Sequence, residues 1–92
     1  MIIVEENRCE SCHEPTGNPI GSICPADCQY SRVVLAIACD RYCVEIAAGK
    51  HDFRCDGFIG KALSREFSGK HYVKLETARV KAIEWLERKC QD

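Results

Sequence analysis

The chain has 92 residues, 46% of them hydrophobic and 29% charged, and a formal net charge of −1. This length suits one domain with a modest core, and the composition argues against both a disordered chain and a membrane protein. Only cysteine is abnormal, with eight residues. We expect a single domain over residues 1–92, with a cysteine-rich metal-binding part in 1–56 and a helical part in 57–92.

The N-terminus and the cysteines together predict a compartment. Residues 1–6 contain neither a basic segment nor an apolar run long enough for a signal peptide or a membrane span. We therefore expect a cytoplasmic protein without membrane contact. In a reducing compartment, closely spaced cysteines are more often metal ligands or redox thiols than structural disulfides. A secreted chain whose signal has been trimmed is the alternative.

The first half of the chain contains one ambiguous segment. Residues 1–6 are apolar and β-branched, which predicts a strand, and residues 14–22 hold two prolines and two glycines, which predicts a loop. Ser22 and Pro25 are suited to the start of a helix, and the chain from there to Ala48 predicts a helix that ends at Gly49. Residues 33–38 would equally form a buried strand, with a turn at 40–41 and a return strand over 44–46. We prefer the helix.

The second half predicts two helices around a strand. Residues 56–57 are a turn signal, 58–67 fit a short amphipathic helix, and 71–76 alternate as a strand does. Thr77 is a suitable cap for the clearest element, a helix over 78–90. Trp85 borders the apolar stripe of that helix, which consists of Ala78, Ala82, Ile83, Leu86 and Cys90. The predicted fold class is α+β, with a zinc-knuckle-like N-terminal half.

The strongest chemical signal is a pair of cysteine pairs. Cys9-x2-Cys12 is followed, after a Pro/Gly loop, by Cys24-x3-Cys28. Two close pairs joined by a loop can place four sulfurs around one ion, because each pair comes from a single turn. Core or redox cysteines are the competing interpretation. His13, next to Cys12, is an alternative ligand.

A second set of ligands follows in the sequence. Cys39-x3-Cys43 precedes His51-x3-Cys55, and i, i+4 spacing on a helix would bring two ligands onto one face. A site built from Cys24, Cys28, Cys39 and Cys43 is another division. The simpler interpretation is that Cys39 and Cys43 are buried apolar side chains, as free cysteines often are. Cys90, on the stripe of the last helix, is interpreted as a packing residue.

Zinc is the expected ion, because intracellular four-thiolate and three-thiolate-one-histidine sets are closed structural sites. An iron–sulfur cluster uses the same thiols and is the alternative cofactor, although the ferredoxin spacing is absent. The chain has no phosphate-binding loop, zinc-protease motif or nucleophile elbow, and four protein ligands leave no open coordination position. We therefore expect that the protein is not an enzyme.

The expected function is that of a small zinc-binding protein, acting as a protein-interaction or regulatory adaptor. An iron–sulfur electron carrier or cluster-handling protein is the second hypothesis. Residues 1–28 hold five acidic and one basic side chain, whereas 61–92 hold eight basic and five acidic ones. The basic residues of 61–92 permit a nucleic-acid-binding regulator, but interleaved glutamates disfavour it. A protein partner is expected, with homodimerisation through Trp85 as a further option.

Overall fold

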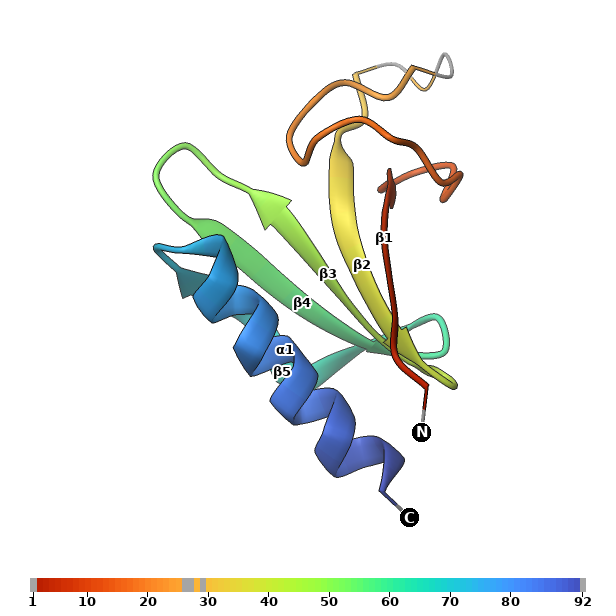
Figure 1. The fold of residues 1–92 in the computed structure, drawn as a ribbon, viewed down its shortest axis with the longest axis vertical. Coiled ribbons are helices and arrows are strands. Elements are labelled where there is room, and N and C mark those ends of the chain that lie inside the picture. Colours follow the sequence, from red (N-terminus) through yellow and green to blue (C-terminus); the bar gives the residue numbers. More distant parts are fainter. Residues whose placement is uncertain (1, 26–27, 29, 92) are drawn as a thin grey trace.

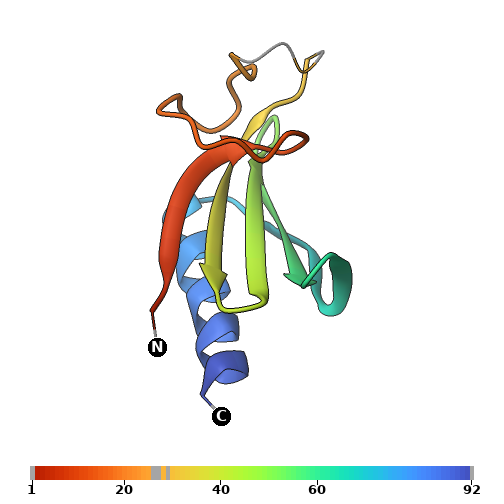
Figure 2. The same cartoon turned by 90° about the vertical axis from the view of Figure 1, so that its right-hand side faces the viewer.

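The structure is a computed structural model that describes residues 2–25, 28 and 30–91 (Figure 1). Its elements are β1 (Val4–Cys9), β2 (Val33–Cys39), β3 (Tyr42–Ala48), β4 (Phe53–Ile59), β5 (Ala62–Tyr72) and α1 (Leu75–Cys90). The five strands form one sheet in which each pairs antiparallel with the next along the chain. The helix lies across one face of this twisted sheet (Figures 1 and 2). The α+β class is therefore confirmed.

The core lies between α1 and the sheet. Alternation along each strand sends every second side chain toward the helix. On the helix, Trp85 is fully buried; it stacks on Phe67 with ring centroids 5.4 Å apart and meets Tyr42 edge-on at 6.1 Å. The other buried members of this core are Leu35, Ile37, Cys39, Val44, Ile46, Cys55, Ala78, Ala82 and Leu86.

The helix preferred between Ser22 and Ala48 is wrong. Residues 33–48 form the β2–β3 hairpin instead, in which Cys39 pairs with Tyr42 and the turn lies at 40–41. Asp40 adopts a left-handed conformation there, with φ of 58°. Residues 33–37 are all buried, so β2 has no polar face. A strand buried on both faces gives a continuous apolar run that periodicity cannot distinguish from a helix. Residues 26, 27 and 29 of that prediction lie outside the described residues.

The helix predicted over residues 58–67 is also wrong. Ile59 pairs with Ala62 across a two-residue turn, in which Gly60 has φ of 62°. Gly57 lies within β4, not in a turn, and pairs with Ser64 of β5. The sheet therefore continues past residue 56, where the sequence predicts that the helical part begins. The helical part of the chain begins only at Leu75.

The pairing of β4 with β5 is irregular beneath the helix. Asp56 pairs with Ser68, but the next residue, Gly57, pairs with Ser64, so residues 65–67 bulge out of register. A bulge re-aims side chains, and here it accompanies the stacking of Phe67 on Trp85. The alternation of residues 61–67 is lost as a result, which explains the mistaken helix.

The last helix is confirmed, with adjustments at its N-terminal end. Its apolar stripe faces the sheet as predicted, but Trp85 is at the centre of the contact and not at its border. Lys74, rather than Thr77, occupies the cap position, and its side chain makes no cap hydrogen bond. The strand expected over 71–76 ends at Tyr72. Within the described part of the chain, no helix combines the length and apolarity needed to cross a bilayer.

Candidate metal centre

The first cysteine pair lies where β1 ends. Cys9 is the last residue of β1 and is fully buried, and the chain then turns sharply, with the His13 amide donating to the Cys9 carbonyl at 3.0 Å. The turn points two backbone N–H groups at sulfur: those of Ser11 and Cys12 donate to Cys9 Sγ at 3.3 and 3.4 Å. Amide donors of this kind stabilise a thiolate, which is the form that binds metal.

The second pair lies on a loop that extends β2 beyond the sheet. Reciprocal backbone hydrogen bonds join Val33 to Gly21 and Ser22, and the Cys24 amide donates to the Ser31 carbonyl at 2.8 Å. The Ser31 amide in turn donates to the Cys28 carbonyl at 3.2 Å. These contacts form an arm, described for residues 21–25, 28 and 30–32, that carries both cysteines.

Hydrogen bonds connect the first turn to this arm. The Glu10 amide donates to the Arg32 carbonyl at 3.0 Å, and the Arg32 amide donates to the Glu10 carboxylate at 3.3 Å. The hydroxyls of Ser11 and Ser31 are 2.6 Å apart. The protein therefore orients the two turns toward each other at the end of the sheet remote from the C-terminal end of α1 (Figure 1).

The result is a four-cysteine cluster, made of Cys9, Cys12, Cys24 and Cys28. Its four sulfurs lie within 4.8 Å of one another, and the Sγ atoms of Cys12 and Cys24 are 4.0 Å apart. Four ligands in a tetrahedron with bonds of about 2.3 Å are separated by about 3.8 Å, as simple geometry requires. The donor set therefore fits one tetrahedral metal ion after small adjustments, with Cys9 and Cys24 on the buried side.

The cluster is electrostatically uneven. The amide of Cys12, followed by that of Ser11, lowers the pKa of the Cys9 thiol to about 6 despite its burial. The neighbouring Cys12 side chain, together with burial, raises the pKa of Cys28 to about 12. Because a second and third negative charge are unfavourable beside the first thiolate, the cluster would hold protons without a cation; a divalent ion removes this repulsion.

The structure does not bring the second predicted ligand set together. Cys39 and Cys55 belong to the core beneath α1, whereas Cys43, one position past the partner of Cys39, faces away from the helix. His51 is exposed in the turn between β3 and β4. Cys39 ends β2 about 20 Å along the strand from Val33, which pairs with Cys9 of the cluster. A site that joins Cys24 and Cys28 to Cys39 and Cys43 therefore does not form either.

Sequence reasoning missed a cleft bordered by charged side chains on the face opposite α1. It has a volume of about 610 Å³, and its lining comprises Arg8, Glu10, His13, Cys43, Glu45, Phe58, Gly60 and Lys61. His13, the alternative ligand, is exposed in this cleft and lies outside the cluster. Arg8 Nη2 donates to Cys43 Sγ at 3.2 Å, and burial raises the pKa values of Cys43 and Glu45. The lining residues come from β1, β3, β4 and two turns that are far apart in the sequence, so spacing gave no signal.

Fold and site together define a small α+β protein with a four-cysteine cluster that could hold a metal ion. No family model, curated protein or solved structure matches the chain.

Proposed function

We propose that this protein is a non-catalytic zinc-binding module that acts as a protein-interaction or regulatory adaptor. The observation that carries the proposal is the convergence of four thiols, from two turns joined by a Pro/Gly loop, to within 4.8 Å of one another. Four-thiolate sets of this kind are typical of structural zinc sites, in which the ion fixes the two loops that supply its ligands.

The spacing of the sulfurs favours a single ion over an iron–sulfur cluster. A mononuclear tetrahedral site separates its thiolates by about 3.8 Å, close to the 4.0 Å between Cys12 and Cys24. An iron–sulfur cluster distributes its four thiolates over two or four irons, so at least some of the thiolates lie further apart than they do around a single ion. Zinc is the expected ion for a closed four-thiolate site, and iron remains the ion to test against it.

The absence of an open position supports a non-catalytic role. Four thiolates complete the tetrahedron, so neither water nor substrate has a place on the ion. A structural zinc contributes about 10–16 kcal/mol of apparent folding free energy in small peptides, which is enough to order two loops. The ion would therefore act by shaping the arm and the turn beside it.

The surface of the arm supports an interaction role. Ile23 and Tyr30 flank the cysteines there and are 50% and 84% exposed. Tyr30 also holds a left-handed backbone conformation, with φ of 69°, which is uncommon for a bulky side chain. Large apolar side chains held outward beside a rigid metal site suit a protein partner. Trp85 is fully buried and cannot contribute to such a surface.

Nucleic-acid binding through residues 61–92 receives less support. Arg79 pairs with Glu5 and Glu76, Lys89 with Glu66 and Lys81 with Glu84, so several helix cations are already engaged. Phosphate recognition relies on free cationic side chains.

Elemental analysis of protein purified without added metal tests the proposal, together with a visible spectrum. We expect one zinc per chain and no absorption in the visible range. Cys24→Ser should lose the metal, whereas the matched control Cys43→Ser, whose thiol lies outside the four-cysteine cluster, should retain it. Iron with visible colour would favour the iron alternative, and metal-free protein would refute the proposal.

The adaptor role needs a separate test. Tyr30→Ser and Val73→Ser each remove a large exposed side chain, but only the first lies beside the cluster. Affinity capture from host extract should enrich specific proteins on the native chain and on Val73→Ser, and should lose them on Tyr30→Ser at unchanged zinc content. Equal capture by all three proteins would contradict a role for this surface.

A further inference from the structure

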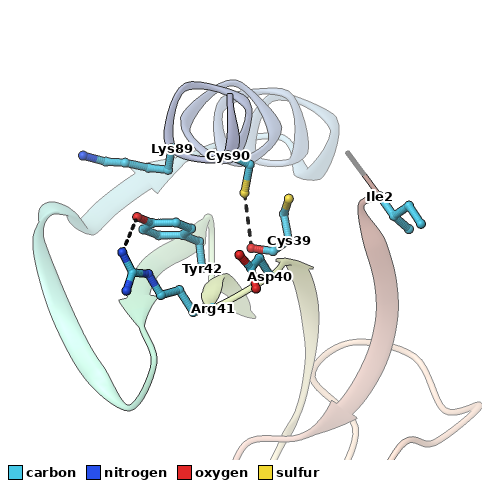
Figure 3. A pocket seen from close by; sticks show the side chains of 7 residues that line it. All are labelled: Ile2, Cys39, Asp40, Arg41, Tyr42, Lys89 and Cys90. Carbon is cyan, nitrogen blue, oxygen red and sulfur yellow. Dashed lines mark hydrogen bonds between the residues drawn. The ribbon is translucent and has the colours of Figure 1, made fainter. Parts of the chain in front are cut away.

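A separate pair of thiols lies at the other end of the sheet. Cys39 ends β2, and Cys90 is the last residue of α1. The Cys90 thiol donates to the Cys39 backbone carbonyl at 3.3 Å, and both sulfurs project into the space between the helix and the β2–β3 turn (Figure 3). Residues 51 positions apart in sequence therefore place their thiols side by side.

This thiol pair borders a pocket open to solvent. The pocket has a volume of about 810 Å³ and is lined by Ile2, Cys39, Asp40, Arg41, Tyr42, Lys89 and Cys90. Cys39 is 4% exposed and Cys90 is partly exposed, so a small reagent in the pocket reaches Cys90 first. Arg41 and Lys89 add positive charge at the rim, although Lys89 is paired with Glu66 at 2.6 Å.

We propose that Cys39 and Cys90 are a site of reversible oxidation, at which a disulfide ties the end of α1 to the β2–β3 hairpin. The two other thiols outside the four-cysteine cluster do not border this pocket. Cys43 faces the opposite side of the sheet, and Cys55 is fully buried under the helix. This inference does not depend on the proposed function, because the pair is remote from the cluster.

The oxidant would be a low-molecular-weight disulfide, and the exchange balances in two steps. The Cys90 thiolate attacks one sulfur of the oxidant, which forms a mixed disulfide and releases one small thiol. The Cys39 thiolate then attacks Cys90 Sγ, which forms the protein disulfide and releases the second small thiol. The two protein thiols lose two electrons to the oxidant, and their two protons pass to the departing thiolates.

The surroundings of Cys90 predict that thiol–disulfide exchange at this residue is slow at neutral pH. Burial, together with the neighbouring Cys39 side chain, raises the pKa of Cys90 to about 11, so little thiolate is present to attack. Cys39 and Cys90 are therefore suited to a structural disulfide that forms under sustained oxidation, and not to fast catalytic thiol exchange.

Peptide mapping of the metal-loaded full chain tests this site. The protein is incubated with oxidised glutathione, its free thiols are trapped with N-ethylmaleimide, and it is digested with trypsin without reduction. We expect the peptide 33–41 linked to the peptide 90–92, and its loss after treatment with dithiothreitol. Cys90→Ser should abolish the link, and Cys43→Ser should leave its yield unchanged.

Two outcomes of the mapping would overturn the proposal. One is oxidation that stops at mixed disulfides or joins these residues to other cysteines. The other is an equal yield of the link in urea-denatured chain, since folding would then contribute nothing. A second measurement uses the unmutated chain and so does not depend on the folding of any variant. Oxidation should raise the urea concentration at the midpoint of unfolding, because the disulfide closes a long loop. An unchanged or lowered midpoint would contradict the proposal.

Discussion

At the scale of single residues, Gly57 shows how tightly the helix meets the sheet. A Cβ atom at this position would lie 3.1 Å from the Phe67 carbonyl oxygen and 3.2 Å from Trp85 Cη2. Such contacts are tighter than most packed side chains make, so the neighbouring atoms would have to shift by a few tenths of an ångström. The largest core side chain therefore depends on the smallest residue beneath it, although the sequence pattern of Asp56-Gly57 indicates a turn.

We expect Gly57→Ala to destabilise the fold by about 1–3 kcal/mol, the usual cost of overpacking a core. Gly17→Ala is the matched control, since a Cβ there meets no heavy atom within 4 Å. Urea unfolding at saturating metal measures both variants. Equal stability of the two would show that Trp85 does not pack against β4 as described.

At the scale of elements, the ion pair between β1 and α1 joins the edge of the sheet to the helix. Arg79 Nε and Nη2 donate to the two Glu5 carboxylate oxygens at 2.8 and 2.9 Å. The hydrogen bonds from Arg79 lower the pKa of Glu5 below its ordinary value. The partners come from residues 74 positions apart, so the pair reports whether β1 is in place against the helix.

A double-mutant cycle with Glu5→Gln and Arg79→Met should give a coupling energy of about 0.2–1 kcal/mol near neutral pH, as expected for a partly exposed pair. Because the folded-state pKa of Glu5 is lowered, this contribution is fully present above its ordinary pKa. It is lost as the pH falls through the lowered value. Lys81 and Glu84, 4.0 Å apart and exposed, form the control pair and should show less coupling. Coupling that persists in strong acid would contradict this assignment.

The elements also show what the sequence could and could not predict. The final helix was predictable because its apolar stripe has helical period and only one face is buried. The β2–β3 hairpin was not, because residues 33–37 are buried on both faces. The signal that could have decided it is the high content of β-branched residues in 33–38, with Asp40 at a turn position.

The candidate site was predictable in part for a related reason. Cys9 and Cys12 flank the turn that follows β1, and Cys24 and Cys28 lie on a loop, so spacing in sequence determines the distance within each pair. Cys39, Cys43 and Cys55 lie in strands, where neighbours are set by register and by the face each residue occupies. Spacing therefore identified the first set but misled for the second, and it could not reveal the proximity of Cys39 to Cys90.

At the scale of the whole molecule, the cluster and the core occupy different regions. The core consists of residues from β2 to β5 and α1, whereas the cluster lies in the turn and the arm beyond the sheet (Figure 1). Cys9 and Val33 join the two regions through strand pairing, and Ile20 packs against the core from the segment between the two cysteine pairs. A metal ion would therefore order residues 10–32 more than it orders the remainder.

Removing the metal with a chelator should increase backbone hydrogen exchange in residues 10–32 before it does so in β3, β4 or α1. Trp85 fluorescence should retain the emission of a buried indole under the same conditions. Uniform loss of protection across the chain would show instead that the ion holds the whole fold.

The convergence of four sulfurs on one ion is tested most directly by X-ray absorption at the edge of the bound metal. We predict a first shell of four sulfurs at about 2.3 Å, without a second metal atom nearby. A shell containing nitrogen or oxygen, fewer than four sulfurs, or a neighbouring metal would contradict the account.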